Sequence, residues 1–109
     1  MRRGEIWTAA GRNGYTGKPR PVLIVQDDRF SETNSITVCP FTTKPTSTPL
    51  FRVPVDPASA NGLTTLSWLM ADKIATMPKA NLGRRIGRLD DETMLRLNRA
   101  MLVFLGLAG

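Results

Sequence analysis

The sequence predicts one mainly β domain spanning residues 1–109: a small barrel of about six strands closed by a C-terminal α-helix. Short apolar stretches separated by turn-rich segments fill the first two-thirds of the chain, which is typical of β-strands. The C-terminal segment instead places apolar side chains at helical spacing. A hydrophobic content of 41% is enough for one packed core, and the length leaves no room for a second domain.

Three strands are expected in the first half of the chain. Gly4–Thr8 forms the first, and Ala10–Pro19, with its three glycines, forms a mobile loop. Pro21–Gln26 is a continuous apolar run, which indicates a strand buried on both faces. A polar turn at Ser31–Asn34 then leads into a strand at Ile36–Phe41.

Three further strands are expected before the helix. Thr42–Pro49 is rich in Thr, Ser and Pro and forms a loop. Phe51–Val55 alternates between apolar and other side chains, and Pro54 within it favours an edge strand. Leu66–Thr76 is expected to be a longer strand, and Arg84–Leu89 a short one.

The C-terminal segment carries the start and stop signals of one helix. Asp90 is a suitable N-cap, and the two acidic residues after it favour the helix dipole. Leu89 and Met94 are spaced as a hydrophobic staple, and Gly106 and Gly109 favour a helix end near the end of the chain. The expected apolar stripe consists of Met94, Leu97, Met101, Leu102 and Leu105.

The net charge of +6 is unevenly distributed. Residues 1–30 carry six basic and three acidic groups, residues 79–99 carry the same numbers, and the stretch between carries three of each. If the two ends meet in space, they form a basic patch suited to a polyanion. The alternative is a basic protein with no such partner.

Several classes of site and location are disfavoured by composition. The chain has no histidine, which excludes a His acid–base pair and His-ligated metals, and its one cysteine makes a zinc site improbable. No Gly-rich phosphate loop follows a strand. No apolar run suits a signal peptide or a membrane span, so we expect a cytoplasmic protein with Cys39 reduced.

The most informative charged residue is Arg20, in the segment Lys18-Pro19-Arg20-Pro21. Two prolines fix the backbone on both sides of it, at the junction between a loop and a strand. A guanidinium held in this way suits phosphate, because its donors match two oxygens at once. The alternative is an ordinary surface arginine at the start of a strand.

Hydroxyl groups and one aromatic residue are further candidates. Thr42, Thr43 and Lys44 follow an apolar strand, and hydroxyls at a strand end can donate to phosphate oxygens. Taken alone, these residues are better explained as an ordinary polar end of a strand. Tyr15, the only tyrosine, lies in the glycine-rich loop and could stack on a base, unless that loop is only a mobile surface segment.

Asp72 is a carboxylate inside an otherwise apolar segment and therefore needs a partner. Strand alternation predicts that it shares a face with Trp68, Met70 and Ile74. A structural ion pair or a backbone hydrogen bond is favoured over a catalytic role.

Taken in order, five segments resemble the MazF/PemK/Kid family of bacterial toxin–antitoxin toxins over nearly the whole chain. The last of them leads into the helix, as the family's usual ending does. These segments are Arg3–Trp7, Lys18–Asp28, Ile36–Thr43, Ser67–Ile74 and Arg85–Leu89.

The resemblance implies a fold and an activity. The fold is an SH3-like barrel that forms a homodimer. The activity is that of an mRNA interferase, a metal-independent and cofactor-free endoribonuclease that cuts single-stranded RNA at preferred sequences through attack of the 2′-hydroxyl. A cognate acidic antitoxin is the expected partner.

Individual residues match the family's functional positions. Arg20 matches its catalytic Arg, Thr42 its catalytic Thr or Ser, and Asp72 a carboxylate used by some members. We expect the RNA-binding residues to be Tyr15, Lys18, Thr43 and Lys44.

The sequence also departs from the family pattern. Met70 and Ala75 stand where some members carry arginines beside the carboxylate, and the first loop lacks the histidine that some members use. The general base stays open, because an arginine is essentially always protonated. Either Asp72 is the base, or the reaction has no dedicated base and depends on electrostatic assistance alone.

Two other functions remain possible: a non-enzymatic gyrase-binding toxin of the CcdB type, and a non-catalytic nucleic-acid-binding barrel.

Overall fold

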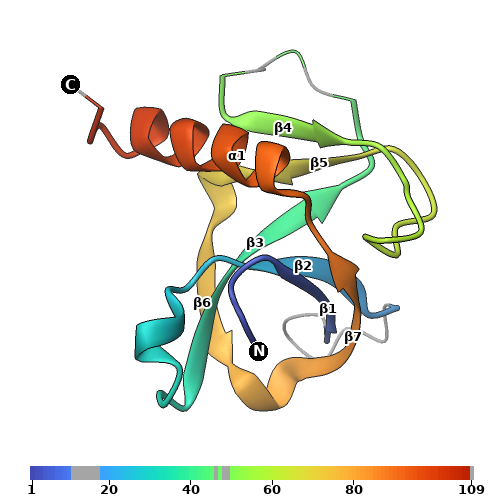
Figure 1. The fold of residues 1–109 in the computed structure, drawn as a ribbon, viewed down its shortest axis with the longest axis vertical. Coiled ribbons are helices and arrows are strands. Elements are labelled where there is room, and N and C mark those ends of the chain that lie inside the picture. Colours follow the sequence, from blue (N-terminus) through green and yellow to red (C-terminus); the bar gives the residue numbers. More distant parts are fainter. Residues whose placement is uncertain (11–17, 46, 48–49, 109) are drawn as a thin grey trace.

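A computed structural model describes residues 1–10, 18–45, 47 and 50–108. Within these ranges the chain forms a curved β-sheet with one C-terminal helix lying across it (Figure 1), which confirms the predicted mainly β class. The strands are β1 (Glu5–Ala9), β2 (Arg20–Ile24), β3 (Ser35–Thr42), β4 (Arg52–Val55), β5 (Ser67–Met70), β6 (Ala75–Pro78) and β7 (Leu82–Arg88). The helix is α1 (Asp91–Phe104), and the 3₁₀ turns are η2 (Asp28–Phe30), η3 (Ala71–Lys73) and η4 (Lys79–Asn81).

The strands pair antiparallel in the order β4-β5-β3-β2-β1-β7, and β6 pairs with the first half of β3. In the described residues the ladder does not close, because β4 and β7 are not paired. The chain between β4 and β5 covers this gap: the Arg88 amide donates to the Ala60 carbonyl at 2.8 Å. A Cβ on Gly87 would lie 2.3 Å from the backbone of Asn61, so only glycine allows this approach.

The expected long strand Leu66–Thr76 is wrong, because η3 divides it into β5 and β6. Leu69 lies opposite Phe41 and Ala75 lies opposite Val38. A step of three residues along β3, from Phe41 to Val38, therefore corresponds to a step of six residues from Leu69 to Ala75. The three extra residues form η3. Pro40 lies at this point of β3 and has no N–H to donate to a ladder. The division raises the number of strands from about six to seven.

Two apolar clusters lie on opposite faces of β2 and β3. Leu23 and Cys39 belong to the cluster beneath α1, whereas Val22, Ile24 and Val38 belong to the other. The prediction that Pro21–Gln26 contains a strand buried on both faces is therefore confirmed. The prediction that Phe51–Val55 is an edge strand is also confirmed, by β4.

The helix begins and ends as its sequence predicts. The Asp90 carboxylate accepts a hydrogen bond from the Thr93 amide at 3.0 Å, which is an N-cap. At the other end Gly106 adopts a φ of +73°, and the Leu107 amide donates to the Leu102 carbonyl at 2.8 Å. Together with the bond from the Gly106 amide to the Val103 carbonyl, this is a Schellman ending.

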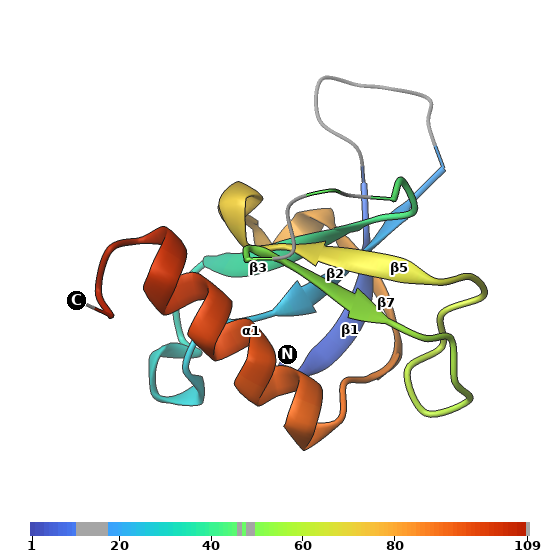
Figure 2. The same cartoon turned by 90° about the horizontal axis from the view of Figure 1, so that it is seen from above.

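The apolar stripe of the helix continues past the core. Leu97 is fully buried against the sheet, but Leu102 is 43% exposed and Leu105 is 58% exposed. These last two residues lie past the core because the final turn of α1 extends beyond β4 and β5 (Figures 1 and 2). We call the exposed residues at this end the C-terminal apolar patch: Leu102, Val103, Phe104, Leu105 and Leu107.

None of the described helices has both the length and the apolar character needed to cross a membrane.

Candidate functional site

Arg20 and Thr42 lie at the same end of the neighbouring strands β2 and β3. Val22 lies opposite Pro40 in this antiparallel pair. Extending the same register by two residues places Arg20, the first residue of β2, opposite Thr42, the last residue of β3. Opposed residues of an antiparallel pair project on the same face. The sheet therefore brings together the two residues that the sequence singled out most strongly.

Arg20 lies at the loop-to-strand junction that its flanking prolines predict. Its partner on β1 is Ala9, which is buried in the cluster of Val22 and Ile24, so Arg20 begins on that face of the sheet. The side chain is exposed, and none of the ion pairs found among the described residues involves it. A fixed guanidinium with no carboxylate partner is available to an anionic ligand.

The Thr42 hydroxyl is held by the turn that ends β3. Its Oγ1 accepts a hydrogen bond from the Lys44 amide at 3.2 Å. A hydroxyl that accepts from the backbone keeps its own proton free to donate. Thr43 and Lys44 are exposed beside it, and Lys18 is exposed just before β2. The structure thus gathers Lys18, Thr43 and Lys44 at the same sheet end, whereas Tyr15 lies outside the described residues.

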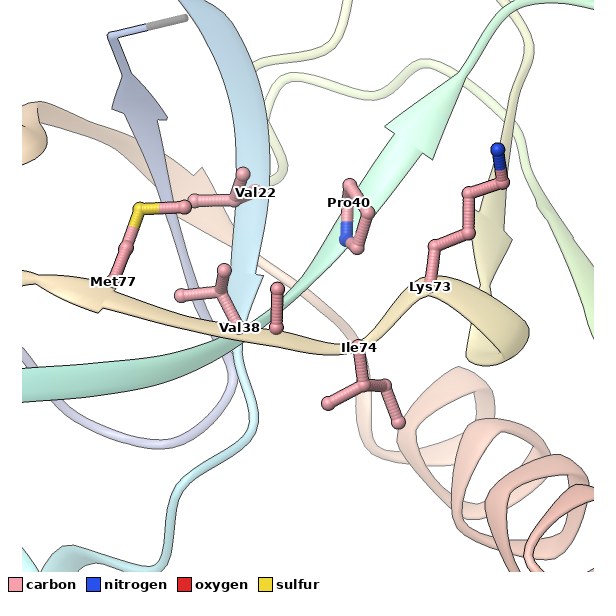
Figure 3. Close-up of a pocket in the computed structure, with 7 residues that line it drawn as sticks. Val22, Val38, Pro40, Lys73, Ile74 and Met77 are labelled. Carbon is pink, nitrogen blue, oxygen red and sulfur yellow. The ribbon is translucent and has the colours of Figure 1, made fainter. Parts of the chain in front are cut away.

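An apolar cavity of about 480 Å³ lies on the face of the sheet that carries Val22 and Pro40, each two residues along its strand from Arg20 or Thr42. Val22, Val38 and Pro40 form its floor, and Met77 reaches toward Val22 from the neighbouring β6 (Figure 3). Lys73 extends alongside Pro40 and is the cation of this cavity. Lys73 is a site residue that the sequence does not indicate, because the predicted unbroken strand is divided here by η3. The face therefore combines two cations and a hydroxyl with an apolar surface.

Asp72 lies in η3 rather than in a strand, so the expectation that it shares a face with Trp68, Met70 and Ile74 is wrong. A 3₁₀ turn does not follow the two-residue alternation of a strand. Two hydrogen bonds from Arg52 reach its carboxylate, from Nε to Oδ1 at 2.7 Å and from Nη2 to Oδ2 at 2.9 Å. The expected structural ion pair is therefore confirmed. No side-chain hydrogen bond found among the described residues joins Asp72 to Arg20 or Thr42.

The Arg52 bonds also decide the charge of Asp72. They hold the pKa of this carboxyl below its ordinary value of 3.8, so it is ionised at neutral pH. The sequence analysis did not foresee Arg52 as the partner. The one feature of the sequence that could have indicated Arg52 is the alternation of β4, which places Arg52 on the side opposite the buried Val53 and Val55.

Cys39 takes no part in the site. Its side chain is fully buried, and burial raises the pKa of its thiol to about 12. A thiol of this kind is neutral at physiological pH and unreactive as a nucleophile. Within the described ranges, no group of three or more His, Cys, Asp and Glu side chains is arranged to hold a metal ion.

The chain is similar to known proteins over nearly its whole length. The model of the family described as PemK-like, MazF-like toxin of type II toxin–antitoxin system matches residues 2–105. A protein of Mycolicibacterium smegmatis named "Probable endoribonuclease MazF" is 59% identical over 109 residues, which is 100% of both chains.

Solved structures share the fold over nearly the full length. The Mycobacterium tuberculosis toxin MazF-mt6 is 32% identical with a TM-score of 0.80, covering 94% of this chain and 97% of that one. A mycobacterial endoribonuclease solved in complex with its cognate antitoxin is 29% identical with a TM-score of 0.81, covering 98% and 96%.

Proposed function

Because the chain belongs to the PemK-like, MazF-like toxins of type II toxin–antitoxin systems, we propose that it is an endoribonuclease acting at Arg20 and Thr42. Its substrate is single-stranded RNA, which it cuts at preferred sequences and without a metal ion. One observation supports the proposal: Arg20, which has no ion-pair partner among the described residues, begins β2 at the same end of the β2–β3 pair where Thr42 ends β3.

The RNA supplies the nucleophile in this reaction. The 2′-oxygen attacks the adjacent phosphorus, a P–O2′ bond forms and the P–O5′ bond breaks. The products are a 2′,3′-cyclic phosphate and a 5′-hydroxyl, and the leaving oxygen takes up a proton. DNA lacks the 2′-hydroxyl and is not cleaved by this route.

The protein's main contribution is to stabilise charge on the phosphorane. Arg20 donates two hydrogen bonds to the non-bridging oxygens, and the Thr42 hydroxyl donates a third. Prepositioned donors of this kind are each worth about 10² to 10³ in rate.

The proton of the 2′-hydroxyl passes to water in this mechanism. Arg20 is permanently protonated and does not serve as the base. Arg52 already donates to both oxygens of Asp72, which favours electrostatic assistance over a dedicated carboxylate base.

The proposal extends to the protein's partners. An acidic, extended antitoxin segment binds over the basic sheet end around Arg20, Lys18 and Lys44, where it mimics RNA. The related mycobacterial endoribonuclease has been solved with its cognate antitoxin.

The proposal also includes self-association and location. A homodimer forms through the C-terminal apolar patch, and the protein acts in the cytoplasm. A gyrase-binding toxin or a non-catalytic barrel would require no opposed Arg20 and Thr42, and no observation favours either.

Total RNA treated with the purified protein tests the proposal. We expect new 5′-hydroxyl ends at a shared sequence, found by ligation-based sequencing, with unchanged rates in excess EDTA. A synthetic RNA with a single 2′-deoxynucleotide at a mapped site should resist cleavage there. RNA that stays intact, loss of activity in EDTA, or cleavage of the deoxy substrate would contradict the proposed chemistry.

A further inference from the structure

A second groove lies on the other face of the sheet end, and the mechanism above does not use it. Two cavities form it, of about 260 and 520 Å³, and they share Thr8, Pro19 and Arg84 as lining residues. The smaller cavity lies between the start of β2, the chain connecting β4 to β5, and β7. The larger continues past Lys18 and Gly83. We call the two together the Arg84 groove.

The groove adjoins the candidate catalytic pair. Pro19 and Pro21 flank Arg20, Thr43 follows Thr42, and all three line the smaller cavity. Successive residues of a strand project on opposite faces. The groove and the candidate catalytic pair therefore lie on opposite faces of the same sheet end. If an RNA strand places its scissile phosphate at Arg20 and Thr42 and continues over this end, the neighbouring nucleotide reaches the groove.

Arg84 is held in place through its backbone. Its amide donates to Thr8 Oγ1 at 3.0 Å. A Cβ on the preceding Gly83 would lie 2.5 Å from the same oxygen, so the glycine makes room for this bond. The Arg84 side chain is exposed and takes part in no ion pair found among the described residues, whereas its neighbour Arg85 pairs with Glu5 at 3.4 Å.

The lining of the groove matches a nucleobase better than a bare phosphate. An apolar floor, made by two prolines, Leu63 and Ile86, suits the flat faces of a base. Hydroxyls surround that floor, and neither cavity is lined by a carboxylate. Single-stranded RNA is read in this way, with unstacked bases placed against planar or apolar surfaces and hydrogen-bonded at their edges. The hydroxyls belong to Thr8, Thr43, Thr64, Thr65 and Ser67.

We propose that the Arg84 groove binds the base next to the scissile phosphate and that Arg84 is a specificity-determining residue. The inference rests on the proposed function. A guanidinium only donates, so it favours a base that offers carbonyl acceptors over adenine, which has none. The hydroxyls of Thr64 and Thr65 complete the polar rim.

The experiment compares Arg84→Ala with Arg85→Ala, which removes the same charge from the next residue of β7 but outside the groove. Both variants and wild type cut total RNA, and their 5′-hydroxyl ends are sequenced. We expect Arg84→Ala to relax the preference at one position beside the cut by about 5- to 150-fold, the discrimination of one bidentate base contact. Arg85→Ala should keep the wild-type preference. Arg84→Gln and melting curves of all variants exclude loss of folding as the cause.

A binding experiment tests the role of Arg84 independently of RNA cleavage. Each protein selects from a randomised pool of short 2′-O-methyl RNAs, which have no 2′-hydroxyl to attack, and the bound fraction is sequenced. Wild type should enrich carbonyl-bearing bases at one position, and Arg84→Ala should not. Wild type that shows this enrichment but cuts no RNA would refute the proposed function alone.

Two outcomes would overturn the role of Arg84. One is identical base preferences for Arg84→Ala, Arg85→Ala and wild type. The other is a uniform loss of affinity across sequences, with the slope of log K against log salt smaller by about 0.7, because that marks a phosphate contact.

Discussion

Arg52 of β4 and Asp72 of η3 form a bidentate ion pair, with N–O distances of 2.7 and 2.9 Å, although they are twenty residues apart in sequence. Each side chain is only 18% exposed. The pair fixes the edge strand β4 to the turn that divides β5 from β6. The ring of Phe51, beside Arg52, packs against Phe104 of α1 with ring centroids 5.3 Å apart. The carboxylate thus has a structural role that the chain's own contacts explain.

Replacing Asp72 with Asn should cost stability rather than catalysis. A pair of this burial lies between exposed pairs and fully buried ones, so we expect a loss of about 1–3 kcal/mol in unfolding free energy. Cleavage per folded molecule should stay within a few-fold of wild type. Urea unfolding and single-turnover cleavage measure the two quantities, with the exposed Asp56→Asn as control. A hundredfold loss of rate in a fully folded variant would instead identify Asp72 as the base.

Acid should remove the contribution of this pair to stability. The pKa of Asp72 in the folded protein lies below its ordinary value of 3.8, because Arg52 hydrogen-bonds the ionised form. Its stabilisation is therefore complete well above pH 3.8 and is lost as the pH falls through the folded-state pKa. The difference in unfolding free energy between wild type and Asp72→Asn should therefore become smaller as the pH falls through the folded-state pKa of Asp72. A difference that stays constant into strong acid would contradict the assignment.

Arg20→Ala should lower the cleavage rate by about 10² to 10³ without unfolding the protein, because one prepositioned donor group is lost. Arg20→Lys should recover part of the rate, since it keeps the charge but not the two-pronged geometry. Arg29→Ala is the matched control, because Arg29 is an exposed arginine paired with Asp27 in η2. Single-turnover rates on one mapped RNA site measure the effect. Wild-type activity in Arg20→Ala would remove the basis of the mechanism.

Cys39 should resist thiol reagents in the native protein. The side chain is fully buried and its thiol has a pKa of about 12, so the reactive thiolate is scarce and inaccessible at neutral pH. Labelling with iodoacetamide, followed by mass spectrometry, should be slow in buffer and rapid in denaturant. Rapid labelling of the folded chain would show that the core around β3 opens readily.

The C-terminal apolar patch should mediate self-association. Leu105 and Leu107 are 58% and 70% exposed, and such residues in a contiguous patch mark an interaction surface. The double change Leu105→Ser/Leu107→Ser should shift the protein from dimer toward monomer in light scattering coupled to size-exclusion chromatography. Leu66→Ser, at a residue that is 42% exposed and outside the patch, should not. An unchanged dimer in the double variant would place the interface elsewhere.

Features that depend on local physics can be predicted from the sequence alone. The N-cap at Asp90 and the glycine ending at Gly106 follow from hydrogen-bonding rules within one helical turn. The buried strand around Leu23 and the edge strand around Pro54 follow from apolar runs and from the missing proline amide. Arg20 is indicated by the two prolines that flank it and Thr42 by its place as a hydroxyl at the end of an apolar strand, and both match a family pattern.

Which distant groups come together depends on the three-dimensional packing of the chain. The antiparallel pairing of β2 with β3 places the start of β2 at Arg20 and the end of β3 at Thr42 at the same end of the sheet, and a one-residue slip of either strand would move its side chains to the opposite face. The excess chain taken up by η3 turned Asp72 toward Arg52, which no spacing in the sequence signals. The length of α1 beyond the sheet left Leu105 exposed, because an apolar stripe shows which face is hydrophobic but not where its partner surface ends. These outcomes depend on long-range pairing, and a single sequence encodes that pairing only through the packing of the whole fold.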